Sequence, residues 1–303
     1  MKKTLTLLLA LSLLLTLAAC GGSSASPTPA PSEAPAAESQ APVESPAPTP
    51  APTEAPAAKD DLIVFAAASM TETLSAVKPL FEAAYPAYNV VYNFDSSGTL
   101  KTQIQEGADC DVFISAAQKQ MNQLDIEAGA QNNPDGLDFL LPGSRTNLLE
   151  NKVGLVVSEG NPKGVTSFDQ LAALLESRQV LLAMGNSDVP VGQYTERILS
   201  FYGLPTEDLA LAGVISYGSN VKEVTTQVKE ASVDCGVVYC TDAFSAGLAV
   251  VDTATAEMCG QVIYPAAVLK NSHDIAAAQA YLDFLRTPEA EAIFTAVGFS
   301  PVK

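Results

Sequence analysis

Short apolar runs alternate with amphipathic helical patterns from residue 61 almost to residue 303, and this alternation constrains the fold more than any other feature. Residues 62–68 and 90–94 are two such runs. Each is short enough for a buried strand and is followed by apolar residues at helical spacing. A helix between successive strands returns the chain across the sheet, so the strands that it joins pair in parallel. The pattern predicts an α/β fold in which mainly parallel sheets are flanked by helices.

Serine residues at two strand-to-helix junctions form the first candidate site. Ser69 follows the first run, and Glu72 three residues later completes a capping-box pattern at the start of a helix. Pro79 within that helix predicts a kink or a break. Ser96 and Ser97 stand at the second junction, where either can cap the next helix. Ser69 alone is more simply a helix cap, but two junctions of one design favour a shared anion site, because hydroxyls and free N–H groups meet there.

The same kind of junction recurs in the second half of the chain. Val191 and Val221 begin predicted helices after strand-like runs, and Tyr239 ends another run. Ligands of parallel sheets bind beyond the carboxyl ends of the strands, so these positions mark the same region as the serines. Tyr239 by itself could equally be core packing, although its hydroxyl is unusual in an apolar strand. Asp242, shortly after it, is interpreted as a turn or cap residue.

Composition and missing motifs argue against several classes of function. The net charge of −18 argues against nucleic acid and an anionic membrane surface as partners. The sequence has one histidine, His273, and no G-x-S-x-G, H-E-x-x-H, P-loop or G-x-G-x-x-G motif, so we expect no enzyme and no cofactor. The cysteines after Cys20 lack metal-ligand spacing, and no bound metal cation is expected. In an exported chain they could form one or two disulfides, in a pairing that the sequence leaves open: Cys110, Cys235, Cys240 and Cys259.

Residues 1–59 precede the predicted fold and have a composition of their own. Lys2 and Lys3 lead into a leucine-rich segment that is too short for a comfortable membrane span and ends in LAAC at Cys20. This pattern resembles a bacterial lipoprotein signal, which implies a cleaved signal peptide at 1–19 and a lipid-bearing Cys20. Residues 20–59 are rich in Ala, Pro and Ser, and this composition predicts a disordered tether that begins at the lipidated cysteine.

Five separated motifs, in order, resemble the molybdate-binding protein of molybdate ABC importers. They read FAAASMTETL, FDSSGTLKTQIQEGADCDVFISAAQKQM, VPVGQY, GVVYCTDA and VIYPAAV, and the resemblance runs from about Asp61 to the end of the chain. It implies a two-lobed fold of the type II periplasmic-binding-protein class, with two crossover strands as the hinge. Lobe I would comprise residues 60–150 and 265–303, and lobe II residues 151–264.

The resemblance also implies a binding site for an oxyanion between the lobes. Ser69 and Ser97 would donate hydroxyl hydrogen bonds from lobe I. Val191 and Val221 would donate backbone N–H groups from lobe II, and Tyr239 its hydroxyl. No Lys or Arg belongs to this set, so the site offers donors only and should reject an anion that carries a proton.

The function implied by the resemblance is capture and delivery of molybdate or tungstate. The protein would be a monomer, exported and lipid-anchored at the outer face of the cytoplasmic membrane, and would pass its ligand to an ABC permease. A receptor for sulfate or another tetrahedral oxyanion is the alternative within the class. Two other functions are considered: an enzyme that acts on a phosphorylated or sulfated substrate, and a surface sensor. Two neighbours of the site bear on selectivity: Gly98 stands where the family often has serine, and Asp95 is expected to face solvent or cap the next helix.

Overall fold

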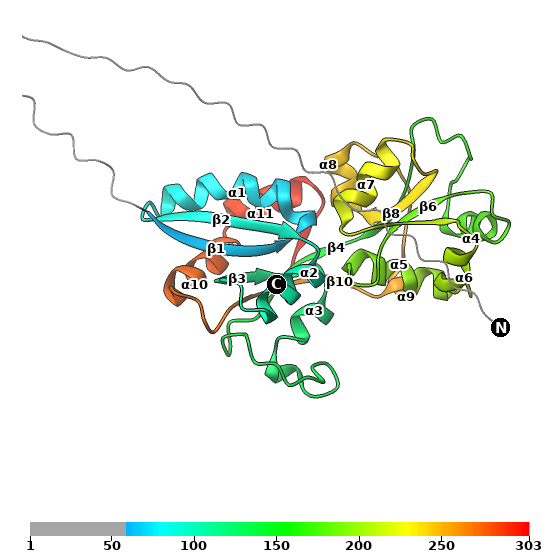
Figure 1. Cartoon of the computed structure of the whole chain (residues 1–303). Coiled ribbons are helices and arrows are strands. Elements are labelled where there is room, and N and C mark those ends of the chain that lie inside the picture. The colour runs from blue at the N-terminus through cyan, green and yellow to red at the C-terminus, as the bar shows by residue number, and fades with distance from the viewer. Residues whose placement is uncertain (1–58, 303) are drawn as a thin grey trace, which may run out of the picture. The chain divides into compact units, whose positions relative to one another are not determined.

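The computed structural model describes residues 59–302, which fold into two lobes, each built on one β-sheet (Figure 1). The predicted signal peptide, Cys20 and nearly all of the predicted tether lie outside the described residues. Within the described residues, no helix has both the length and the apolar composition that a membrane span needs.

The sheet of lobe I has six strands in the order β11-β4-β10-β3-β1-β2. β1, β2 and β3 pair in parallel, and β10, β4 and β11 join them in antiparallel fashion. Residues of α1, α10 and α11 share one hydrophobic core, and residues of α2 and α3 lie in a second core that contains Phe65 and Phe113. The elements of lobe I are β1 (Asp60–Ala67), η1 (Ala68–Met70), α1 (Thr71–Ala84), β2 (Tyr88–Asp95), α2 (Ser97–Gln105), β3 (Val112–Ile114), α3 (Gln118–Asn122), η2 (Ile126–Ala128), β4 (Thr146–Asn151), β10 (Val262–Val268), α10 (Ile275–Phe284), α11 (Pro288–Ala296) and β11 (Ser300–Pro301).

The sheet of lobe II has five strands in the order β7-β6-β8-β5-β9. β6, β7 and β8 pair in parallel, while β5 is antiparallel to both of its neighbours. Helices α5 and α7 pack against β6 and β8. The elements of lobe II are β5 (Val153–Val157), α4 (Phe168–Glu176), β6 (Leu182–Gly185), α5 (Pro190–Phe201), α6 (Thr206–Leu211), β7 (Ile215–Gly218), α7 (Val221–Lys229), β8 (Cys235–Tyr239), α8 (Cys240–Ala246), β9 (Val250–Thr253) and α9 (Ala256–Cys259).

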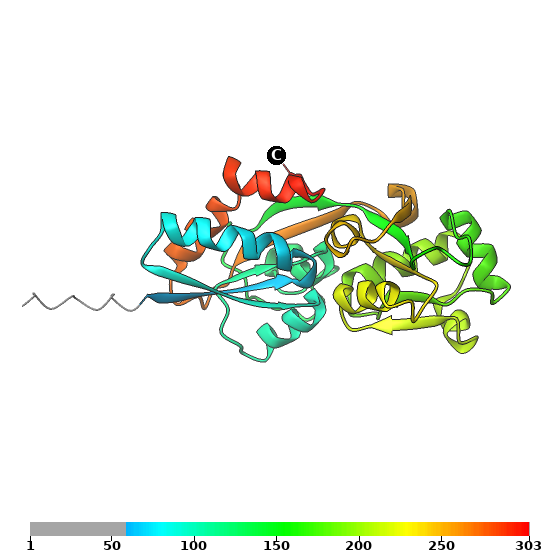
Figure 2. The ribbon, with the colours of Figure 1, turned by 90° about the horizontal axis from the view of Figure 1, so that it is seen from above.

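The two sheets share one strand order, and the chain crosses between them twice. In each lobe the first of the parallel strands lies between the other two, and a crossover strand pairs with the third. The chain leaves lobe I between β4 and β5 and returns between β9 and β10, in green and orange in Figure 2. The expectation of parallel pairing holds for these three strands of each lobe. The sheets are mixed, however, because the outgoing β4 and the returning β10 run in opposite directions.

Local details around α1 correct two predictions. Ser69 lies in the short turn η1, and Met70, not Ser69, precedes α1 without a side-chain cap, so the predicted capping box is wrong. α1 also continues through Pro79, so the predicted break does not occur. Val77 and Phe81 on either side of Pro79 are fully buried, and their packing offsets the backbone hydrogen bond that proline removes. The exact residue boundaries of the lobes stay a prediction.

Candidate functional site

The five residues predicted from the sequence line one cavity between the lobes. Its volume is about 10 Å³, and its walls contain Ser69, Ser97, Val191, Val221 and Tyr239. Every one of these residues lies at or just beyond the carboxyl end of a parallel strand, three strands coming from each lobe once Ala116 after β3 is included. The predicted convergence of strand ends is therefore present. The sequence did not single out the remaining wall residues as site residues: Ala67, Ala68, Asp95, Ser96, Ala116, Val189 and Pro190.

The two serines of lobe I are both buried, and each forms a hydrogen bond with a different partner. Ser69 Oγ lies 2.8 Å from the hydroxyl of Tyr264, a residue of the crossover strand β10. Ser97 Oγ accepts a hydrogen bond of 2.9 Å from the backbone N–H of Ala116. Ser96 is the cap of α2, because its hydroxyl accepts the N–H of Thr99. Ser97 is thereby free of capping, and its own O–H proton can point into the cavity.

Lobe II contributes the starts of two helices. Val191 is the second residue of α5, after Pro190, and Val221 is the first residue of α7. Among the described residues, no acceptor binds the N–H of either valine. The cap residue Asn220 accepts the N–H groups of Lys222 and Glu223 and leaves that of Val221 open. Both helices thus present free N–H groups and the positive end of a helix dipole to the cavity.

Tyr239 is a buried donor that lacks a partner. It is 1% exposed, and its hydroxyl has no hydrogen-bond partner among the described residues. Burial, followed by the neighbouring Tyr264, raises the pKa of Tyr239 well above its usual value, so the hydroxyl keeps its proton. A buried hydroxyl left unpaired costs about 1–3 kcal/mol, which an acceptor in the cavity would recover. Of the two interpretations left open by the sequence, this geometry favours a binding role.

Asp95 lies in the cavity wall, whereas the sequence analysis expected it to face solvent or to cap the next helix. Its carboxylate is half-buried and accepts the N–H of Ser96 at 2.7 Å and, across the lobes, the side-chain amide of Asn220 at 3.4 Å. It neither faces bulk solvent alone nor caps α2, since Ser96 performs that role. Two donors from the protein therefore hold the acidic group of the cavity wall at one oxygen.

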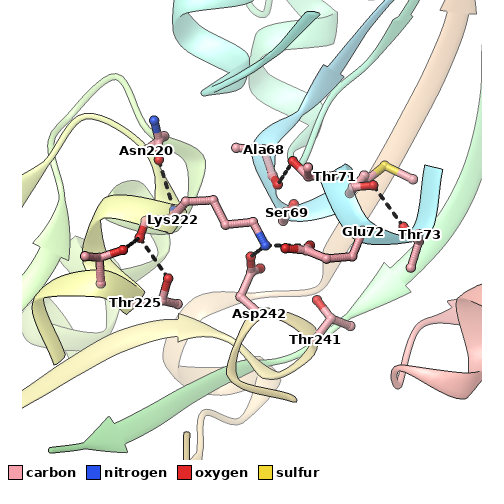
Figure 3. A network of polar contacts seen from close by, with 12 residues as sticks. Ala68, Ser69, Thr71, Glu72, Thr73, Asn220, Lys222, Thr225, Thr241 and Asp242 are labelled. Carbon is pink, nitrogen blue, oxygen red and sulfur yellow. Dashed lines mark hydrogen bonds and ion pairs between the residues drawn. The ribbon is translucent and has the colours of Figure 1, made fainter. Parts of the chain in front are cut away.

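Lys222 joins the lobes through two carboxylates beside the cavity (Figure 3). Its ammonium lies 2.6 Å from Glu72 of α1 in lobe I and 3.0 Å from Asp242 of α8 in its own lobe. Asp242 occupies the first turn of α8, but its carboxylate pairs with Lys222 and does not cap the helix. The sequence analysis missed this cluster, because nothing in the spacing of the three residues brings them together.

Burial governs the proton equilibria of this pair. Burial raises the pKa of Asp242 to about 6, although the charge of Lys222 opposes the shift. Burial also acts to lower the pKa of Lys222, but Asp242 and Glu72 outweigh it, and the net shift is upward. Lys222 therefore stays charged at neutral pH, whereas the pKa of Asp242 lies above its usual value.

Gly98 lies close to lobe II. A Cβ atom at this position would lie 2.2 Å from the carbonyl oxygen of Asp188 in lobe II, far inside van der Waals contact. Only glycine fits at position 98 while the lobes are this close. The departure from the serine that is common in the resembling family therefore has a steric consequence.

Cysteine and metal chemistry play no visible part in the described residues. All four cysteines there are free thiols and none pairs with another, which answers the question that the sequence left open: Cys110, Cys235, Cys240 and Cys259. No group of three or more His, Cys, Asp or Glu side chains within residues 59–302 is arranged to hold a metal ion.

Comparison with known proteins identifies the family of this chain. The sequence profile of the family described as "Bacterial extracellular solute-binding protein" matches residues 62–300. The chain belongs to this family. It is 32% identical, over 80% of its length and 87% of the relative's, to the putative ABC transporter substrate-binding lipoprotein YvgL of Bacillus subtilis. It is 30% identical, over 88% of its length and 92% of the relative's, to the molybdate-binding protein ModA of Mycobacterium tuberculosis.

Solved structures share the two-lobed fold. The substrate-binding domain of a putative molybdenum ABC transporter from Clostridium difficile is 28% identical, with a TM-score of 0.58 over 81% of this chain and 100% of that one. The periplasmic molybdate-binding protein of Azotobacter vinelandii is 24% identical, with a TM-score of 0.67 over 80% and 100%. This member of the solute-binding family thus has the type II periplasmic-binding-protein fold.

The raised pKa of Asp242 predicts how the stability of the protein depends on pH. The folded protein holds this proton more tightly than the unfolded chain, so the contribution of Asp242 to the free energy of unfolding grows as pH falls and is lost as pH rises through about 6. Relative to the parent, Asp242→Asn should therefore become less stable by roughly 1–3 kcal/mol between about pH 7.5 and about pH 5. Urea titrations across this range measure the change. A difference between variant and parent that is constant with pH would contradict the assignment.

Proposed function

We propose that this protein is an exported solute-binding protein that captures molybdate or tungstate between its lobes and delivers the anion to an ABC permease. One observation carries the proposal: hydrogen-bond donors from both lobes line a single small cavity, and those of lobe II have no acceptor among the described residues. A tetrahedral dianion accepts hydrogen bonds on every side and matches a site that surrounds it with donors.

The charge of the ligand would be balanced by dipoles. No Lys or Arg lines the cavity, and the chain as a whole carries a net charge of −18. The N-termini of α5 and α7, with their free N–H groups, supply local positive potential at Val191 and Val221. Such a site binds an anion through local geometry against an unfavourable overall field.

The size of the cavity supports an inorganic ligand. Its volume of about 10 Å³ is far below the range of roughly 300–1,000 Å³ that holds drug-sized molecules, and the lobes must move apart slightly even for a tetrahedral anion. A phosphorylated or sulfated organic substrate would not fit in the closed arrangement. This argues against the enzyme hypothesis, in keeping with a family of transport substrate-binding proteins.

The names of the relatives supply the chemical class and the cellular setting. Homologues from Mycobacterium tuberculosis and other bacteria are called molybdate-binding proteins, and the Bacillus subtilis relative is called a lipoprotein of an ABC transporter. We infer that this chain is likewise anchored through a lipid on Cys20 at the outer face of the cytoplasmic membrane. The predicted tether would hold the binding lobes away from that surface, and the protein would act as a monomer.

Removal of single donors tests the site. Ser69→Ala, Ser97→Ala and Tyr239→Phe should each weaken molybdate binding roughly 10- to 150-fold, because a hydrogen bond to a charged group contributes about 1.5–3 kcal/mol. Calorimetry with sodium molybdate measures the dissociation constants. Ser177→Ala changes an exposed serine outside the cavity and is the matched control, expected to bind like the parent. Parent-like affinity in all three site variants would mean that the anion binds elsewhere.

Selectivity among anions tests the ligand class. Molybdate and tungstate should bind most tightly, sulfate less tightly because it is smaller, and phosphate undetectably or nearly so. Hydrogen phosphate carries a proton that needs an acceptor, and a site of donors penalises it by as much as ~10⁴-fold. Asp95 is the one carboxylate in the cavity wall, and Ser96 and Asn220 already occupy one of its oxygens. Competition calorimetry near neutral pH decides the order, and displacement of molybdate by equimolar phosphate would refute it.

The fit of Gly98 against lobe II predicts an effect on closure. Gly98→Ala places a methyl group within 2.2 Å of the Asp188 carbonyl oxygen, so the lobes of the variant should not close fully around molybdate. Small-angle scattering should show the parent becoming more compact on addition of molybdate and the variant less so, with weaker binding. Thr102→Ala, at an exposed position of the same helix, controls for helix propensity. Equal compaction of the parent and Gly98→Ala would show that the contact does not limit closure.

A further inference from the structure

We infer that Asn151 and Tyr264 are positioning residues that hold the Ser69 hydroxyl as a donor toward the cavity. They do so through a hydrogen-bond chain of fixed direction, and the inference rests on the proposed oxyanion function. Neither residue lines the cavity. Both belong to strands next to the crossings between the lobes, β4 and β10.

The direction of the chain is set at its far end by the backbone. The N–H of Lys152 donates to Asn151 Oδ1 at 2.8 Å, which fixes the orientation of the amide. Asn151 Nδ2 therefore faces two hydroxyls, those of Thr241 at 2.9 Å and Tyr264 at 3.2 Å. An amide nitrogen can only donate, so the oxygen of Tyr264 is the acceptor in the second contact.

Tyr264 passes this direction on to Ser69. Tyr264 is fully buried, and burial, followed by the charge of Asp242, raises its pKa well above the usual value, so its hydroxyl keeps its proton. Asn151 Nδ2 can only donate, so Ser69 Oγ, 2.8 Å away, is the one side-chain hydrogen-bond partner among the described residues that can accept the proton of Tyr264. We therefore take Tyr264 as the donor, because its buried O–H would otherwise stay unpaired. Ser69 then accepts from Tyr264, and its remaining O–H is free to donate to an anion in the cavity.

The oxygen of Ser97 also accepts a hydrogen bond from the protein, and its proton is also free to donate. Its oxygen accepts the backbone N–H of Ala116, which cannot reverse direction. Both serines thus have an oxygen occupied by a donor from the protein and a proton left over. Without the Tyr264 hydroxyl, the Ser69 hydroxyl would be free to rotate its proton away from the cavity and to accept the proton of hydrogen phosphate there. Tyr264 therefore affects selectivity as well as affinity.

The chain also connects the site to the hinge. Asn151 is the last residue of β4, and Thr241 lies in the first turn of α8, next to the cavity residue Tyr239. The amide of Asn151 thus contacts a hydroxyl on each side: Thr241 in lobe II and Tyr264 in the returning strand. The orientation of Ser69 consequently depends on groups at the crossing between the lobes.

A double-mutant cycle tests the inference on the full chain, purified in detergent. We compare the parent, Ser69→Ala, Tyr264→Phe and the double variant by calorimetry with sodium molybdate. Tyr264→Phe should weaken binding roughly 5- to 30-fold in the parent but less than about threefold in the Ser69→Ala background, because it acts through Ser69. The ratio of molybdate to phosphate affinity should also fall in Tyr264→Phe.

Tyr281→Phe is the matched control. Tyr281 is another fully buried tyrosine of lobe I, and its hydroxyl lies 2.9 Å from that of Tyr92, outside the cavity. This variant should keep parent affinity and selectivity, and its effect should add to that of Ser69→Ala. A melting curve for each variant establishes that it is folded.

A second variant serves if Tyr264→Phe does not fold. Asn151→Asp has nearly the same shape but accepts where the amide donates, so it draws the Tyr264 proton away from Ser69. Its added charge acts in both the parent and the Ser69→Ala background, and the cycle therefore isolates the part that passes through Ser69. Additive effects in these cycles, or unchanged selectivity in Tyr264→Phe, would overturn the positioning role. Absence of molybdate binding by the parent, or no effect of Ser69→Ala, would instead overturn the proposed function.

Discussion

Buried donors without acceptors are the constraint on which the rest of this structure depends. The hydroxyl of Tyr239 and the N–H groups that open α5 and α7, all in lobe II, lie in a region largely closed to solvent, where unpaired polar groups cost free energy. The hydroxyls of Ser69 and Ser97 line the same cavity from lobe I. One sheet cannot surround a small anion with such groups, since the ends of its strands face it from one side only. Two sheets with facing strand ends can, and the two crossings of the chain let them meet.

The contacts between the two lobes differ in how much they contribute to stability and to closure of the lobes. The pair formed by Lys222 and Glu72 has side chains 29% and 49% exposed, so solvent screening keeps its contribution to stability small. The partner on the other side, Asp242, is fully buried and depends on Lys222 for neutralisation. The contact of Gly98 with Asp188 is purely steric. We conclude that closure is shaped more by fit and by the ligand than by attraction between surface charges.

The polar network around the serines is distinguished by which group donates and which group accepts in each hydrogen bond. Hydroxyls can donate or accept, and a site made of them could suit either kind of ligand. Backbone N–H groups remove this freedom: Ala116 fixes Ser97, and Lys152 fixes Asn151 and through it Tyr264 and Ser69. We infer that the backbone of the folded chain thus orients the serines as donors, which is what a fully deprotonated anion requires.

The sequence by itself determined the local elements and the strand ends that carry the site. Apolar periodicity located β1, β2 and their helices, and the junction chemistry pointed to Ser69 and Ser97, while the family motifs pointed to Val191, Val221 and Tyr239. Only the tertiary structure decided that Ser96 caps α2, that Ser69 contacts Tyr264 across 195 positions and that Asp242 is a buried partner of Lys222. The reason is physical: periodicity and caps depend on neighbours within a turn or two, whereas these contacts join segments that meet only when both crossings are made.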